Sequence, residues 1–262
     1  MRAAIYGVGI LAEGLTDWDH ARRVLTGQVA YAAQPARAAH TGNLSGNEAR
    51  RCPVPARYAI DAGLQALAMS PYAPGAVASV FSSASGDLDI ADRNCRGLAA
   101  TPPVLSPTLF HNSVHNAVAG YWGIATGAQT GSVSLSAFDD SFGAGLLEAL
   151  TRVVAGGEPT LYVAYDVRPP PAFASVRALA ASFAVALVLG PAGAGPVGTI
   201  EGTWQPASGP ETAMDDPALD YLRRHNPAAR SLPLLAALAR GTNARIGLRC
   251  GGETGLLLEV AV

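Results

Sequence analysis

The sequence predicts an α/β protein whose sheet is partly parallel and buried. Apolar runs of strand length alternate with segments of helical spacing along the chain. This alternation is typical of sheets whose parallel strands are covered by the intervening helices. No break in composition marks a linker, so we predict a single domain over residues 1–262.

Residues that begin or end helices, together with the spacing of apolar residues, predict the elements of the N-terminal half. Asp17 is a good N-cap for a helix, and Pro71 stops the next helical segment. The expected elements, in order, are a strand Arg2–Ile10, a helix Asp17–Leu25, a polar loop, a helix 53–71, a buried strand Ala76–Phe81, an irregular segment Thr101–Thr108, a helix His111–Gly123 and a strand Thr130–Ser136.

The C-terminal half continues the alternation. A long amphipathic helix follows the strand Thr130–Ser136, and the chain ends in a hairpin around the Gly-rich turn "GGETG". The expected elements are a helix Asp139–Ala155, strands 160–167, 182–190 and 195–204, helices 216–224 and 232–240, and the hairpin 244–262.

Composition excludes several classes of function. A net charge of −2 gives no field that would attract nucleic acid. All 18 basic residues are arginine, so mechanisms that need a lysine are excluded. The three cysteines lack metal-type spacing. No segment has the roughly 20 apolar residues of a membrane span, and the N-terminus lacks a signal-peptide pattern. We therefore expect a cytoplasmic protein without a cofactor, a metal or a membrane span.

Two motifs have simple structural interpretations. Gly7, Gly9 and Gly14 do not have the spacing of a dinucleotide-binding loop, and a tight exit from the first strand explains them better. His111 and His115 lie four residues apart and could share a helix face, but no third metal ligand is near. Side-chain hydrogen bonds to the backbone are the favoured interpretation of this segment.

The segment "SVSLSAFDDSFGAGLLEAL" has the layout of an enzyme's nucleophile turn, with a strand entering a polar corner and a helix leaving it. The amide groups at a helix start would stabilise an anionic nucleophile there. Asp139 and Asp140 stand at the corner, and a carboxylate at this position is also an ordinary N-cap. Ser141 would act as a nucleophile only with a base beside it, and no G-x-S-x-G or S-x-x-K pattern is present. We therefore expect capping.

The segment "SPTLFHNSVHNAVAGYWGIATGAQTGSVSLSAFDDSFGAGLLEAL" resembles the N-terminal half of β-ketoacyl synthases of the thiolase fold. The pieces "AIYGVGI", "ARRCPVPARYAIDAGLQAL", "SVFSSASGD", "LYVAYDV" and "FAVALVLG" follow in the family's order. The resemblance covers about residues 1–200 and is strongest to the short chain length factors of aryl polyene pathways. It implies a thiolase-like fold, mostly its N-terminal half, with residues 201–262 as a reduced C-terminal segment.

The resemblance also implies that the catalytic cysteine is missing. An alignment without gaps places Asp139 at the cysteine position, and an error of one residue would place Phe138 or Asp140 there. None of the three is a thiol. The family's second half, with its two histidines and a lysine, is largely missing; "GTNARIGL", with Arg245, is a weak echo of it. Without a thiolate no acyl-enzyme forms.

The implied function is that of an inactive chain length factor. Such a subunit pairs with an active ketosynthase, receives an acyl carrier protein through the complex and shapes the tunnel for the growing chain. The expected pocket residues are Phe138, Asp139 and Phe142. The expected interface is the strand Thr130–Ser136, which pairs across a two-fold axis, with the neighbouring segment His111–Tyr121; its named residues are Thr130, Ser132, Ser134, His115 and Asn116.

Two alternatives belong to other classes. The chain would be a homodimeric acyl-binding or scaffold protein if it has no ketosynthase partner. It would be a hydrolase if Ser141 lies within hydrogen-bond reach of His115 and an aspartate.

Overall fold

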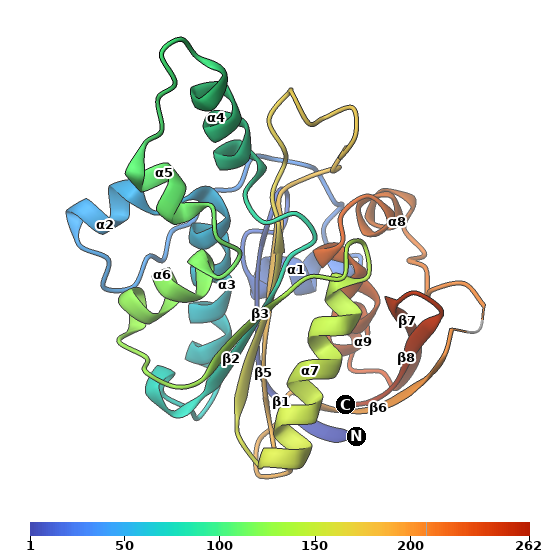
Figure 1. The fold of residues 1–262 in the computed structure, drawn as a ribbon. Helices are drawn as coiled ribbons and strands as arrows, with labels where there is room; N and C mark the ends of the chain where they lie inside the picture. Colours follow the sequence, from blue (N-terminus) through green and yellow to red (C-terminus); the bar gives the residue numbers. More distant parts are fainter. Residues whose placement is uncertain (208) are drawn as a thin grey trace.

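A single mixed sheet organises the described part of the chain, which is residues 1–207 and 209–262 of the computed structural model (Figure 1). Its strand order is β3-β2-β4-β5-β1-β6-β8-β7. β2 runs parallel to β3 and β4, and the other neighbours are antiparallel. The predicted α/β class with a partly parallel sheet is confirmed.

The eight strands are β1 Arg2–Ala12, β2 Ala78–Ser82, β3 Ser132–Leu135, β4 Thr160–Asp166, β5 Phe183–Gly190, β6 Gly198–Pro206, β7 Ala244–Gly251 and β8 Thr254–Ala261. The helices are α1 Trp18–Leu25, α2 Gly46–Arg51, α3 Val54–Met69, α4 Leu88–Ala99, α5 Pro107–Asn112, α6 Ala117–Thr126, α7 Ser141–Gly156, α8 Pro217–Arg224 and α9 Leu232–Arg240, with 3-10 turns at Pro74–Ala76 and Ala228–Ser231. Among the described helices, none is long and apolar enough to cross a membrane.

Helices cover the central strands on both faces. α3 and α6 pack on one face, and α1, α7, α8 and α9 contribute to the core on the other (Figure 1). β4 and β5 are buried along their whole length, which explains their continuous apolar sequence. The C-terminal strands β6, β8 and β7 extend the same sheet beyond β1.

Most elements lie where the sequence places them, with differences near the polar segments. α2 and α4 are additional helices. The predicted helix His111–Gly123 is wrong as one element, because the chain forms α5 and α6 with a break at Ser113–Asn116. His111 and His115 therefore do not share a helix face. No group of three or more potential metal ligands occurs in residues 1–207 and 209–262.

Gly7 and Gly9 lie in the middle of β1 rather than at its exit, which corrects the sequence interpretation. A Cβ on Gly9 would lie 1.9 Å from the backbone oxygen of Ala62, and one on Gly7 would lie 1.9 Å from that of Ala66. The two glycines therefore let α3 pack directly on the strand. Gly14 does occupy a turn, with a φ of 80°.

Gly9→Ala is expected to lower the free energy of unfolding by about 3 kcal/mol, because the new methyl group must push α3 away from β1. Gly120→Ala is the matched control. It adds a methyl group in α6 where nothing lies within 4 Å, so we expect no loss and up to about 1 kcal/mol of gain. Urea unfolding of both variants measures the difference. Equal stabilities would show that α3 does not need this contact.

Candidate functional site

Phe138, in the turn between β3 and α7, has a strained backbone conformation. Phe138 has a φ of 51°, and it is the one non-glycine residue of the described chain with a positive φ. A bulky residue in this region costs about 1–3 kcal/mol and persists only where its surroundings enforce it. A strained strand-to-helix turn is also how elbow-type enzymes present a nucleophile. By backbone geometry the elbow residue is Phe138, one position before Asp139.

Ser141 fixes this turn through its side chain. Its hydroxyl donates to the carbonyl of Phe138 at 2.6 Å and accepts from the amide of Ala137 at 2.9 Å. The residue is 1% exposed. Both bonds go to the backbone, and Ser141 makes no hydrogen bond to a histidine within the described ranges. The structure therefore lacks the contacts that the hydrolase alternative requires, and His115 lies in the exposed break between α5 and α6.

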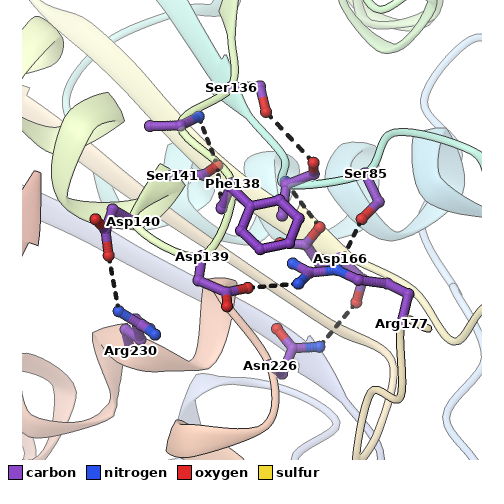
Figure 2. Close-up of polar contacts among 12 residues, drawn as sticks. Ser85, Ser136, Phe138, Asp139, Asp140, Ser141, Asp166, Arg177, Asn226 and Arg230 are labelled. Atoms are coloured by element: carbon purple, nitrogen blue, oxygen red, sulfur yellow. Dashed lines mark hydrogen bonds and ion pairs between the residues drawn. The ribbon is translucent and has the colours of Figure 1, made fainter. Parts of the chain in front are cut away.

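The two aspartates of the turn make ion pairs instead of capping α7, so the predicted capping is wrong. Asp140 is the residue before α7, but its φ of −91° and ψ of 8° are not the extended values of a capping residue. Its carboxylate pairs with Arg230 at 3.1 Å. Asp139 pairs with Arg177 at 2.6 Å. Both carboxylates thus tie the elbow to later parts of the chain (Figure 2).

Arg177 is the central side chain of the site and was not found from the sequence. It comes from the long connection between β4 and β5, and its side chain is 12% exposed. Its Nε donates to Ser85 Oγ at 3.0 Å, and its guanidinium carbon lies 4.3 Å from the centre of the Phe138 ring. Figure 2 shows Arg177 lying between Phe138 and Asp139 on one side and Ser85 on the other. Nothing in the local sequence of that connection distinguishes Arg177 from the other arginines.

Asp166 lies under the same site at the end of β4. Its carboxylate accepts hydrogen bonds from the Ser83 hydroxyl at 3.0 Å and the Ala84 amide at 2.9 Å. Burial raises the pKa of Asp166 to about 7, although these hydrogen bonds and Arg177 lower it in part. A polar residue at the carboxyl end of a parallel strand is a known signal for a site. That signal in "TLYVAYDV" would have identified Asp166 from the sequence.

Asp166→Asn is expected to raise the unfolding temperature at pH 8, where the wild-type protein buries a charge. Because the pKa of the folded state is raised, the folded protein binds the extra proton between about pH 4 and 7, and wild-type stability falls as pH rises through this range. A pKa difference of one between the folded and unfolded states changes the free energy of unfolding by about 1.4 kcal/mol. The advantage of the Asn variant should shrink toward pH 4. Thermal unfolding measured from pH 4 to 8 tests this, and a pH-independent difference would contradict it.

Two of the three cysteines, Cys250 and Cys52, have thiols that are less acidic than usual. Cys250 lies near the first turn of α7, where a Cβ on Gly143 would approach its sulfur at 3.2 Å. Burial, together with Asp140 and Glu211, raises the pKa of Cys250 to about 12. Burial also raises the pKa of Cys52 to about 11. Since only the thiolate is nucleophilic, neither of these two cysteines is activated.

The two phenylalanines expected in a pocket lie in different surroundings. Phe142 is fully buried in the core, 5.7 Å from the ring of Tyr162, which corrects its assignment to a pocket. Phe138 is 62% exposed and projects from the elbow. Neither lines the cavity of about 610 Å³ that lies between the start of α3, α4 and the end of β4 and is lined by Arg51 and Cys52 among others.

β3 forms one edge of the sheet, and its outer side is unpaired by the described residues. The amides of Ser79 and Ser83 in the β2 segment donate to the carbonyls of Gly131 and Leu135. Because successive backbone groups point in opposite directions, the polar groups of Ser132 and Ser134 point away from β2. The hydroxyl oxygen of Ser134 is buried and has no hydrogen-bond partner among the residues that the structure describes.

The other expected interface residues lie just before β3 or just before α6. Thr130 precedes β3, and its hydroxyl donates to the carbonyl of Val77 at 2.6 Å, so its side chain is already engaged. His115 and Asn116 are exposed, and α6, which follows them, packs against β3. Phe110 and Val114, which precede them in the chain, are also exposed, at 62% and 52%.

The opposite edge of the sheet is partly covered by the chain itself. Along β7 the amide of Gly247 donates to the Thr212 hydroxyl at 3.0 Å, and the Thr212 amide donates to the Gly247 carbonyl at 3.2 Å. The β3 edge therefore presents unpaired backbone amides and carbonyls to a partner strand, whereas part of the β7 edge is already hydrogen-bonded to Thr212.

Comparison with known proteins agrees with this architecture. The family model described as β-ketoacyl synthase, N-terminal domain, matches residues 24–245, which extends beyond residue 200. A search of curated proteins finds no match. The solved structure of a ketosynthase (ApeO) in complex with its chain length factor (ApeC) from Xenorhabdus doucetiae is 26% identical, with a TM-score of 0.73 and 99% of each chain covered.

Two further structures share the fold at lower identity. The AntDE:AntF complex, a type II PKS acyl-carrier protein with its ketosynthase bound to the hexaketide, has a TM-score of 0.75 at 14% identity and covers 99% of each chain. The ishigamide ketosynthase/chain length factor has a TM-score of 0.72 at 12% identity, covering 100% of this chain and 99% of that one. With most of its length matched by the family model, this chain belongs to the β-ketoacyl synthase family.

Proposed function

We propose that this chain is a non-catalytic chain length factor that pairs with an active β-ketoacyl-ACP synthase. The observation that carries the proposal is the elbow. It keeps the strained turn of a nucleophile site but holds Phe138 there, beside Asp139. A phenyl ring cannot form an acyl-enzyme intermediate. The turn therefore has the backbone shape of a nucleophile site without a side chain that could carry the acyl group.

Three features support a paired subunit. β3 offers an open edge at Ser132 and Ser134, and the segment before α6, which packs against β3, exposes Phe110 and Val114. An unpaired sheet edge favours association, and so do exposed apolar side chains. The relative from Xenorhabdus doucetiae, at 26% identity, comes from a complex of a ketosynthase with its chain length factor.

In this proposal the β3 edges of the two subunits pair across a two-fold axis. The partner covers Phe138, which would face the tunnel in which the partner's acyl chain grows. The substrate is a growing polyene or polyketide chain carried by an acyl carrier protein, in the cytoplasm. An aryl polyene pathway is the proposed setting, because the sequence resemblance is strongest to proteins of that kind.

Co-expression with a ketosynthase encoded nearby in the same genome tests the proposal. We expect the two chains to co-elute in size-exclusion chromatography as a complex with the mass of one copy of each. A stable homodimer that never includes the ketosynthase would reject the chain length factor and favour the homodimeric scaffold alternative. In that case β3 would pair with β3 of a second copy.

A further inference from the structure

We propose that Arg177 is a positioning residue that clamps the Phe138 ring at the elbow and thereby limits product length. The inference rests on the proposed function. Its basis is that one guanidinium contacts three parts of the elbow region at once: the Phe138 ring at 4.3 Å, the Asp139 carboxylate at 2.6 Å and Ser85 Oγ at 3.0 Å.

Phe138 needs such a clamp because little else holds its ring. The residue is 62% exposed, so its side chain has few neighbours within the chain. Its backbone is fixed by Ser141, but backbone bonds do not fix the side-chain torsions. A guanidinium over the face of the ring is attractive and is the geometry in which arginine stacks best.

Arg177 is itself held in one orientation. Nε donates to Ser85, which follows β2, and Nη1 binds Asp139, so the plane of the guanidinium is fixed at two points. Nη2 is buried and has no hydrogen-bond partner among the described residues. A buried unpaired donor is costly, and the neighbouring ring face is a weak acceptor that offsets part of this cost. The site therefore favours the ring in one position.

The connection that carries Arg177 is anchored separately. At its start, Arg168 makes two hydrogen bonds to Glu13, at 2.7 and 2.9 Å, and its amide donates to Ser182 Oγ at 3.1 Å. Loss of Arg177 should thus release the ring without freeing the whole connection. Loss of Arg168 should loosen the connection and leave the clamp residues intact, which makes it the matched control.

The test compares Arg177→Gln, Arg177→Lys and Arg168→Gln in the complex with the active ketosynthase. We expect Arg177→Gln to co-elute as the wild type does and to shift the products toward longer chains. The preference for the clamped ring orientation should fall by roughly two- to fivefold, as expected for the loss of one cation–π contact. Arg177→Lys keeps the charge but cannot stack as a plane, so it should restore the product only in part. Arg168→Gln should leave the product unchanged.

Phe138→Ala provides the decisive comparison. If Arg177 acts through the ring, Arg177→Gln should add nothing to the product shift of Phe138→Ala. An unchanged product in the Arg177→Gln complex, or full additivity with Phe138→Ala, would overturn the proposal. An equal shift in Arg168→Gln would show that loosening the connection is enough and would overturn it as well.

A second readout on the isolated chain separates the clamp from the proposed function. The Nε–H of Arg177 is hydrogen-bonded beside the Phe138 ring, so ring current should shift its NMR resonance. Phe138→Leu should remove the ring-current part of that shift and leave the part caused by the hydrogen bond to Ser85. A resonance that does not move would overturn the clamp, whereas failure to bind any ketosynthase would reject only the proposed function.

Discussion

Ser134→Pro is expected to abolish pairing with the ketosynthase while leaving the chain folded. The backbone amide of Ser134 points to the open side of β3, so proline removes a donor that β2 does not use. Proline is tolerated on edge strands for this reason. In a two-fold strand pairing, however, the same amide would bond to the partner. Size-exclusion chromatography of the co-expressed chains should show the two proteins apart.

Ser134→Ala is the matched control, because it keeps the amide and removes the hydroxyl. We expect it to co-elute with the ketosynthase, with at most a modest loss of affinity. Circular dichroism must show the same fold for both variants. Co-elution of the Pro variant at wild-type levels would mean that the subunits do not meet at the edge of β3.

Phe138→Ala should lengthen the product of the complex. The substitution removes a phenyl ring that projects from the elbow at 62% exposure and that the partner would cover in the proposed assembly. A smaller side chain leaves room for further extension of the acyl chain. Mass spectrometry of the released chains measures the shift, and an unchanged distribution would remove Phe138 from the tunnel.

The control is Val154→Ala, which shortens another exposed apolar side chain, near the opposite end of α7. It should leave the product length unchanged. A shift caused by Val154→Ala would point to a general effect on α7 and would weaken the role given to Phe138.

The sequence predicts the regular elements well where apolar spacing is strong. Buried strands such as β4 and β5 are continuously apolar, and Asp17 caps α1 by accepting from the amide of His20. α2 and α4 were missed because only Ile90 of the two helices is buried. The capping residues of both helices are nevertheless recognisable in the sequence. Ser45 with Glu48 forms an S-x-x-E pattern at the start of α2, and Asp87 caps α4.

The site was predictable in outline but not in detail. The strand, turn and helix around Phe138 follow from the pattern, and so does the lack of a thiol. The strained residue does not, because a positive φ is rare for phenylalanine and has no sequence signal. Arg177 and Arg230 reach the elbow through contacts far apart in sequence. Residue spacing carries no information about such pairs.

The most direct test of the central claim is the location of the acyl group in the complex. The purified complex is incubated with acyl-loaded carrier protein and analysed by intact-protein mass spectrometry. The account predicts one copy of each chain, with the acyl group on the ketosynthase alone. An acyl group on this chain, or a homodimer that excludes the ketosynthase, would contradict it.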